Sequence, residues 1–173
     1  FYVPANKVKR FAANYNFRKG KLTMIDNPKT SRFLENPAFK SGGGGLCSTA
    51  PDYMRFLLMI ANGGKFEGKR YLTKKTIKLM TTNQVPKEAG WVTIGKQVRE
   101  GIGYGLGFSV REKMSKWDPD RRLGEYGWGG AASTHYWVSP KDELVVLTLA
   151  QVMPFSFSTE WALKKTIYDA LLE

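Results

Sequence analysis

The feature that most constrains the fold of this 173-residue chain is a run of three strand-like segments near its C-terminus. The segments cover about 124–130, 133–139 and 143–151, and they are rich in aromatic and β-branched residues. Only short connections separate them, and Ser139-Pro140-Lys141-Asp142 is a typical turn sequence. Because connections this short join neighbouring antiparallel strands, the run predicts hairpins, the first with Trp-Gly-Gly-Ala at its head.

Helices are predicted on both sides of this run. In SGGGGLCSTAPDYMRFLLMIANGG, Thr49 is a suitable N-cap, Pro51 fits the first turn and Asn62-Gly63-Gly64 ends the helix, which covers 50–62. A second helix is predicted over about 73–82, with Thr73 as its cap. The closing STEWALKKTIYDALLE predicts an amphipathic helix capped by Ser158 or Thr159. Its expected inward face comprises Leu163, Ile167, Ala170 and Leu171.

The remaining segments carry weaker signals. Alternation of large apolar with small or polar residues predicts one half-buried strand over 103–110. The other expectations are a short helix or irregular segment within 1–19, a strand after the turn at 19–20, an ordered loop over 26–40, a loop over 84–102 and a polar surface turn over 111–123.

Composition limits the class of protein. Hydrophobic residues make up 42% of the chain, which is enough for one folded domain over residues 1–173. No apolar run approaches the roughly 18 residues of a membrane span, so no membrane partner is expected. Lys and Arg number 27 against 15 Asp and Glu, giving a net charge of +12. These charges are dispersed and accompany no nucleic-acid-binding motif, so we expect a solvated basic surface or an acidic protein partner, and no nucleic acid.

Cysteine and histidine are scarce, which excludes several kinds of site. With only Cys47 and His135, an internal disulfide and a metal cluster of His and Cys are ruled out, and neither a metal nor a cofactor is expected. No serine lies in a Gly-x-Ser-x-Gly motif, so a Ser-His-Asp triad built on His135 is not expected. SGGGGL lacks the Gly-Lys-Ser/Thr of a phosphate-binding loop.

Three segments, in this order, resemble the serine β-lactamase-related family, especially its class C-like esterases and transesterases. They are SGGGGLCSTAPDYMRFLLMIANGGKFEGKRYLTKKTIKLMTTNQV, GYGLGFSV and GEYGWGGAASTHYWVSPKDELVVLTLAQVMP, and the resemblance extends over nearly the whole chain. It implies an α+β fold of the β-lactamase/transpeptidase type, with an antiparallel sheet flanked by helices. The N-terminal helix and the first two strands of that fold are expected to lie outside this sequence.

The resemblance also implies a site. In this family a serine of a Ser-x-x-Lys motif is the nucleophile. A third motif, often Trp-Gly-Gly in the esterase branch, lies on a strand beside it. Trp128, Gly129 and Gly130 are therefore expected to bind substrate, and the backbone N–H of Ala131 is a candidate oxyanion donor. Such a donor has to lie about 3 Å from the oxyanion. Glycines allow a substrate to approach the strand, and a Trp can wall an acyl pocket.

The sequence departs from the family at the nucleophile. No serine has a lysine three positions later, and no Tyr-Ser-Asn motif is present. In the family both precede the segment that FYVPANKVKRFAANY resembles. We therefore expect the C-terminal half of a serine hydrolase, with one wall of the site, and no activity of this half alone. The alternative is a non-catalytic binding module that retains the fold and its groove.

A missing half has consequences for partners. The strand at 143–151 would present an open apolar edge, which favours pairing with a second copy or with an N-terminal fragment. A small ester or amide would bind once the site is complete. Trp128 stands where β-lactamases carry the Lys of Lys-Thr-Gly, which favours small esters over β-lactams. The family is compatible with either the bacterial periplasm or the cytoplasm.

Overall fold

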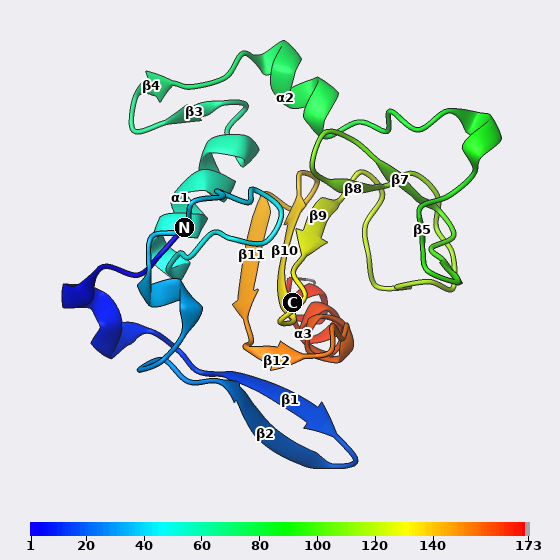
Figure 1. Ribbon diagram of the computed structural model, residues 1–173. Helices are drawn as coiled ribbons and strands as arrows, with labels where there is room; N and C mark the ends of the chain where they lie inside the picture. Colours follow the sequence, from blue (N-terminus) through cyan, green and yellow to red (C-terminus); the bar gives the residue numbers. More distant parts are fainter. Residues whose placement is uncertain (172–173) are drawn as a thin grey trace.

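The computed structural model describes residues 1–171 (Figure 1). Its main sheet is antiparallel, and the strands lie side by side in the order β11-β10-β9-β8-β7. These strands are β11 (Leu144–Leu149), β10 (Thr134–Ser139), β9 (Tyr126–Gly129), β8 (Ser109–Arg111) and β7 (Ile102–Tyr104). The three strands predicted near the C-terminus correspond to β9, β10 and β11, and their two hairpins are confirmed. The register places Tyr136 between Trp128 and Leu147.

Within residues 1–171, three α-helices flank the sheet: α1 (Ala50–Ala61), α2 (Lys74–Met80) and α3 (Ser158–Ala170). In Figure 1, α1 lies beside β11 and α3 lies on the opposite side of β10. The predicted caps of the first two helices are confirmed, because the Thr49 hydroxyl accepts the Asp52 N–H and the Thr73 hydroxyl accepts the Thr76 N–H. None of the helices within residues 1–171 is both long and apolar enough to cross a bilayer.

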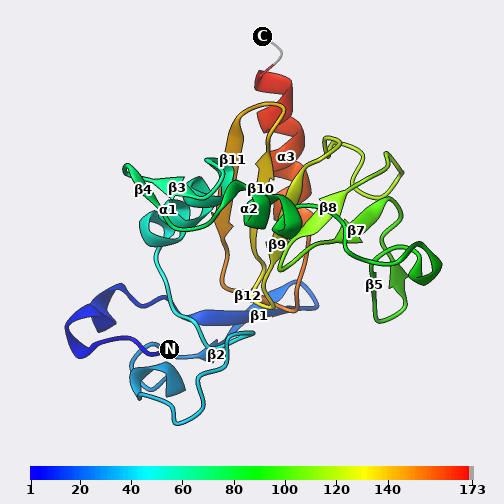
Figure 2. The same cartoon turned by 90° about the horizontal axis from the view of Figure 1, so that it is seen from above.

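Shorter elements surround this framework (Figure 2). A second sheet has the order β12-β1-β2, in which β1 runs parallel to β12. The strands outside the main sheet are β1 (Asn14–Arg18), β2 (Lys21–Asp26), β3 (Lys65–Phe66), β4 (Lys69–Arg70), β5 (Thr93–Ile94), β6 (Gln97–Val98) and β12 (Val152–Met153). The 3₁₀ helices are η1 (Ala5–Arg10), η2 (Arg32–Leu34) and η3 (Lys87–Ala89). The ambiguous segment 1–19 thus contains η1 and β1, and the predicted loop 84–102 contains the β5–β6 hairpin.

The two faces of β10 meet different surroundings because side chains alternate along a strand. Tyr136 and Val138 pack into the apolar core on one face, with Ile60 of α1 and Ile77 of α2. Trp137 points to the other face, where the Lys164 ammonium of α3 lies 5.0 Å from its ring centre. One face is therefore held by burial of apolar surface and the other by charged groups.

The predicted inward face of α3 is wrong. Leu163 is 40% exposed and Leu171 is 51% exposed, whereas Glu160, Lys164 and Tyr168 are buried. These three residues are spaced four apart and share one helix face. The helix begins at Ser158 without a side-chain cap from the preceding residue, and the Ser156 hydroxyl accepts the Ser158 N–H.

Buried ion pairs explain why this polar face turns inward. The Lys164 Nζ lies 2.8 Å from Asp118 Oδ2, 2.9 Å from Glu125 Oε1 and 3.0 Å from Glu160 Oε1. The Tyr168 hydroxyl donates to Glu125 Oε2 at 2.6 Å. A buried lysine is tolerated when opposite charges and hydrogen bonds surround it, and here all three acids are also buried. We call Lys164, Asp118, Glu125 and Glu160 the Lys164 network.

Two other expectations near this network need correction. Residues 103–110 form two strands, β7 and β8, instead of one, because Gly107 adopts a φ of 91° between them and turns the chain. The segment 111–123 forms turns and bends with many exposed residues, as predicted, but Arg111, Asp118 and Arg121 within it are buried. Asp118 pairs with Lys164 of α3, Arg121 pairs with Glu125, and Arg111 donates to the Ser115 hydroxyl. Local polarity was therefore a poor guide to the burial of these three residues.

We predict that Lys164→Met destabilises the chain by about 3–5 kcal/mol, because it leaves buried carboxylates without their cation. Urea unfolding followed by far-UV circular dichroism measures this loss. The matched control is Lys165→Met on the same helix, since Lys165 pairs with Asp169 at the surface. The control should leave the unfolding midpoint nearly unchanged, and equal losses in the two variants would contradict the structural role of Lys164.

Acid should weaken the fold through Glu160. Burial alone would raise the pKa of Glu160, but the hydrogen bond with His135 and the charge of Lys164 lower this pKa from 4.5 to about 2. The stability contributed by the ionised group is therefore complete above about pH 4.5 and is lost as the pH falls toward about 2. Between about pH 5.5 and pH 3 we expect a loss of about 2 kcal/mol from this group.

Urea unfolding at these two pH values tests the assignment. Glu160→Gln should show a smaller loss on acidification than the unmodified chain, because it has no carboxylate to protonate. Glu88→Gln, which changes an exposed carboxylate on η3, should show the full loss. An unchanged pH dependence in Glu160→Gln would mean that other groups cause the acid sensitivity.

Candidate functional site

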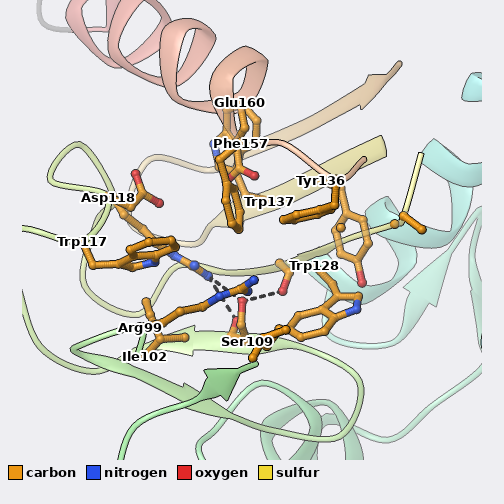
Figure 3. Close-up of a pocket in the computed structure, with 17 residues that line it drawn as sticks. Arg99, Ile102, Ser109, Trp117, Asp118, Trp128, Tyr136, Trp137, Phe157 and Glu160 are labelled. Atoms are coloured by element: carbon orange, nitrogen blue, oxygen red, sulfur yellow. Dashed lines mark hydrogen bonds between the residues drawn. The ribbon is translucent and has the colours of Figure 1, made fainter. Parts of the chain in front are cut away.

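A pocket of about 240 Å³ lies at the end of β9, between the sheet and the loops that cover it (Figure 3). All four residues predicted from the sequence line this pocket, namely Trp128, Gly129, Gly130 and Ala131. Opposite them are aromatic residues from the segments before β9 and after β12, of which Trp117 and Phe157 are labelled in Figure 3. The tertiary structure thus places the Trp-Gly-Gly-Ala motif against an apolar wall.

Strand pairing leaves one side of this motif open. Strand β9 pairs with β10 as far as Gly129, but it pairs with β8 only at Tyr126 and Gly127. Beyond Gly127, the side of β9 that faces β8 has no strand partner among residues 1–171. Open strand backbone of this kind can receive an extended ligand through main-chain hydrogen bonds.

The glycines of the motif are required by packing as well as by access. A Cβ atom on Gly129 would lie 2.8 Å from His135 Nδ1 and 2.9 Å from Phe155 Cε2. A Cβ atom on Gly130 would lie 2.6 Å from the Thr134 hydroxyl oxygen. A side chain at either position would therefore displace the neighbouring strand or the aromatic wall.

The turn after β9 presents a free backbone donor. The Gly130 N–H donates to the Thr134 carbonyl at 2.8 Å, and the Ser133 N–H donates to the Gly130 carbonyl at 2.9 Å. Within residues 1–171, the N–H of Ala131 has no hydrogen-bond acceptor, and the residue is exposed. A tight turn therefore fixes the position of Ala131 while leaving its N–H available at the pocket.

Aromatic rings form much of the wall. The Trp128 ring meets the Tyr104 ring edge-on, with ring centres 4.9 Å apart. Phe157 stacks on Trp161 of α3 with its ring centre 5.3 Å away, and it meets Phe155 edge-on at 4.7 Å. These contacts fix the rings in place and create a rigid apolar lining.

Arg99 is a pocket residue that sequence reasoning missed. It follows β6 within the segment predicted as a loop, and no motif distinguishes it from the other basic residues. Its side chain is buried, and the guanidinium carbon lies 4.9 Å from the Phe157 ring centre and 5.8 Å from that of Trp128. Burial lowers the pKa of Arg99, the nearby charge of Arg121 lowers it further, and Glu160 opposes these effects.

His135 is held in a structural position. Its Nδ1 lies 2.7 Å from Glu160 Oε2, and its Nε2 lies 2.8 Å from the Ser156 carbonyl oxygen. The ring therefore links β10 to the start of α3, with both nitrogens engaged. This arrangement agrees with the expectation that His135 is not the base of a catalytic triad.

Ser109, which lines the pocket, and Ser133, two residues after Ala131, are also engaged. The Ser109 hydroxyl donates to the Gly127 carbonyl at 2.7 Å, and the Ser133 hydroxyl donates to the Val152 carbonyl at 2.8 Å. Both residues are buried. Neither hydroxyl is poised beside a free base, which nucleophilic catalysis by serine requires.

Comparison with known proteins identifies related sequences. The profile of the Beta-lactamase family matches residues 1–167. An uncharacterized protein of Mycobacterium tuberculosis is 32% identical over 158 residues, which are 89% of this chain and 39% of that protein. Acyltransferase calJ of Penicillium decumbens is 27% identical over 140 residues, which are 74% of this chain and 32% of calJ. The chain thus spans about two-fifths or less of the length of these curated relatives.

Solved structures show the same fold. EstCE1, described as a hydrolase with promiscuous acyltransferase activity, is 22% identical with a TM-score of 0.75, over 100% of this chain and 46% of EstCE1. The simvastatin synthase LovD of Aspergillus terreus is 20% identical with a TM-score of 0.71, over 96% of this chain and 43% of LovD. The implied α+β fold, an antiparallel sheet flanked by helices, is confirmed. The profile match over residues 1–167, together with this fold, shows that the chain belongs to the Beta-lactamase family.

Proposed function

We propose that this chain forms one wall of the acyl-transfer site of a serine hydrolase or acyltransferase. In this proposal the open side of β9 receives the substrate, Trp128 walls the acyl group, and the Ala131 N–H is one of the two oxyanion donors. The observation that carries the proposal is the unpaired Ala131 N–H, held by a tight turn beside the pocket. A preorganised donor of this kind typically contributes about 2.7–4 kcal/mol to lowering an acyl-transfer barrier.

The substrate is proposed to be a small ester. EstCE1 is described as a hydrolase with acyltransferase activity, and calJ is named as an acyltransferase, so both reaction types occur among proteins similar to this chain. Trp128, in place of a lysine, offers an apolar ring and no charge at the start of the motif. The remaining lining is rich in aromatic rings, which suits an acyl group with an apolar body.

The nucleophile is proposed to come from a polypeptide segment other than this chain. No serine of the sequence lies in a Ser-x-x-Lys motif, and the hydroxyls of Ser109 and Ser133 are used in structural hydrogen bonds. Without a serine and its base, an acyl-enzyme intermediate cannot form. The chain alone is therefore proposed to be inactive.

The first test measures hydrolysis of p-nitrophenyl butyrate by the purified chain, together with labelling by a fluorophosphonate probe. We expect neither turnover above the buffer rate nor a labelled serine. Turnover with one labelled serine in the chain would contradict the proposal. Adding an N-terminal fragment that carries Ser-x-x-Lys, taken from the related Mycobacterium tuberculosis protein or from the chain's own gene, should restore hydrolysis.

In the reconstituted enzyme, the role of Ala131 can be measured. Ala131→Pro removes the backbone N–H and should lower kcat by about 10²–10³-fold. Ala131→Gly keeps the N–H and should retain most of the activity. Thermal unfolding of both variants separates loss of the donor from loss of the fold, and equal activity of the two folded variants would exclude Ala131 as an oxyanion donor.

A non-catalytic binding module is the second candidate function. This alternative is favoured because residues of this chain alone form the pocket, and most polar groups of the pocket lining are already paired. Ester binding that persists after addition of the Ser-x-x-Lys fragment, without turnover, would support this alternative over acyl transfer.

We also propose that β11 pairs with another chain through its free edge. Strand β11 ends the main sheet within the part of the chain that the structure describes, and its side chains are largely half-buried. An unprotected edge of six residues is a template for intermolecular pairing. The proposed partner is a second copy of the chain or an N-terminal fragment of the same enzyme.

Analytical ultracentrifugation tests this pairing. We expect oligomers, and Leu149→Lys should raise the dissociation constant at least about tenfold by placing a charge at the β11 edge. Leu149 is 50% exposed, and the matched control Leu163→Lys alters a comparably exposed leucine on α3. A monomer at all concentrations, or equal effects of the two substitutions, would contradict pairing through β11.

A further inference from the structure

We propose that Arg99 is the anion-binding group of the pocket, and that the ester which enters it carries a carboxylate at the end remote from the reacting carbonyl. The identity of the ligand as an ester rests on the function proposed above. Carboxylate binding itself does not depend on catalysis.

The first argument is that Arg99 is buried without a partner. Its side chain is 6% exposed, and its Nε is buried without any hydrogen bond. Within residues 1–171, no carboxylate pairs with its guanidinium and no acceptor receives a hydrogen bond from it. An unpaired buried charge is strongly unfavourable, so pairing with Arg99 would favour binding of an anion.

The other buried arginines show that this is unusual for the molecule. Arg111 donates to the carbonyls of Glu100 and Lys113 and to the Ser115 hydroxyl. Arg121 lies 3.0 Å from Glu125 Oε1 and donates to Ser109. Arg111 and Arg121 also have an Nε without a hydrogen bond, but their terminal nitrogens donate to protein acceptors. Within the described residues, the terminal nitrogens of Arg99 have no such acceptor.

The surroundings of Arg99 stabilise the cation without satisfying its hydrogen bonds. The ring centres of Phe157, Trp117, Trp128 and Phe155 lie 4.9, 5.7, 5.8 and 5.9 Å from its guanidinium carbon. Aromatic faces attract a cation but accept no strong hydrogen bonds from its five N–H groups. By excluding water, they also strengthen a bidentate pair between guanidinium and carboxylate.

The acids nearest to Arg99 are already engaged. Glu160 and Asp118 both line the pocket. Glu160 contacts His135 and Lys164, and Asp118 contacts Lys164. These carboxylates contribute to the surrounding field, but neither lies within ion-pair distance of Arg99 in the described residues. The anion that pairs with Arg99 is therefore proposed to come from the ligand.

The location of Arg99 determines the kind of ligand. Figure 3 shows its side chain extending across the pocket toward Trp128 and Ser109. Trp128 lies on β9, whereas the proposed donor Ala131 lies in the turn that follows Gly129, and both residues line the pocket. A ligand whose carboxylate pairs with Arg99 beside the Trp128 ring, and whose ester carbonyl lies at Ala131, joins two different parts of the pocket lining. The proposed substrate class is an ester with an apolar body and a terminal carboxylate.

Binding by the purified chain tests this proposal without turnover. The probes are 4-phenylbutyrate and its neutral amide, 4-phenylbutyramide, and tryptophan fluorescence follows binding because Trp117 and Trp128 flank Arg99. We expect the carboxylate to bind at least about tenfold more tightly than the amide. Only the carboxylate should raise the melting temperature appreciably, since the ligand that binds the folded state more tightly stabilises it more.

Variants assign the preference to Arg99. Arg99→Gln should abolish the preference for the carboxylate, and Arg99→Lys should retain part of it because the charge remains without the planar fork. The control Arg55→Gln removes the same charge at an exposed ion pair with Glu67, outside the pocket, and should keep the full preference.

Several outcomes would overturn the proposal. Equal affinity of the unmodified chain for acid and amide would do so even if Arg99→Gln failed to fold. A folded Arg99→Gln that keeps the preference would do so as well. Loss of carboxylate binding on addition of the Ser-x-x-Lys fragment would show that a protein carboxylate pairs with Arg99 instead. Conversely, carboxylate binding without restored hydrolysis would support Arg99 and contradict the acyl-transfer function.

Discussion

The buried ammonium of Lys164 is the interaction on which the arrangement around the pocket depends. It joins α3 to Asp118 and Glu125, which come from the segment between β8 and β9. Through Glu160 it also fixes His135 on β10. Charges buried in this way hold position only when all partners are present, because each lone charge would be strongly destabilising. The packing of α3 and of the loop over the pocket is therefore cooperative.

The pocket is formed by this arrangement together with the unpaired part of β9, because β9 pairs with β8 only as far as Gly127. The Lys164 network supplies Asp118 and Glu160 to the pocket lining, while the open side of β9 supplies Trp128 and Ala131. The resulting pocket has a rigid lining of aromatic and charged side chains. Its internal charges are paired within the described residues except at Arg99, which makes that residue the natural contact for a ligand.

Local chemistry made part of the fold and site predictable. The caps at Thr49 and Thr73, and the strands on both sides of Trp-Gly-Gly-Ala, depend on residues a few positions apart. The resemblance carried by that motif pointed to the correct family and to four residues that do line one pocket. The turn at Gly107 was missed because the alternation of apolar residues continues through it, although the chain reverses there.

The sequence by itself determined the family, the antiparallel strands and the motif, because these follow from short-range patterns and residue types. Only the tertiary structure decided which face of α3 is buried, that β1 pairs with β12, and that Arg99 enters the pocket. The physical reason is that burying Lys164 or Glu160 is unfavourable for either residue alone. It becomes favourable only when charges from distant segments meet, and no local pattern contains that information.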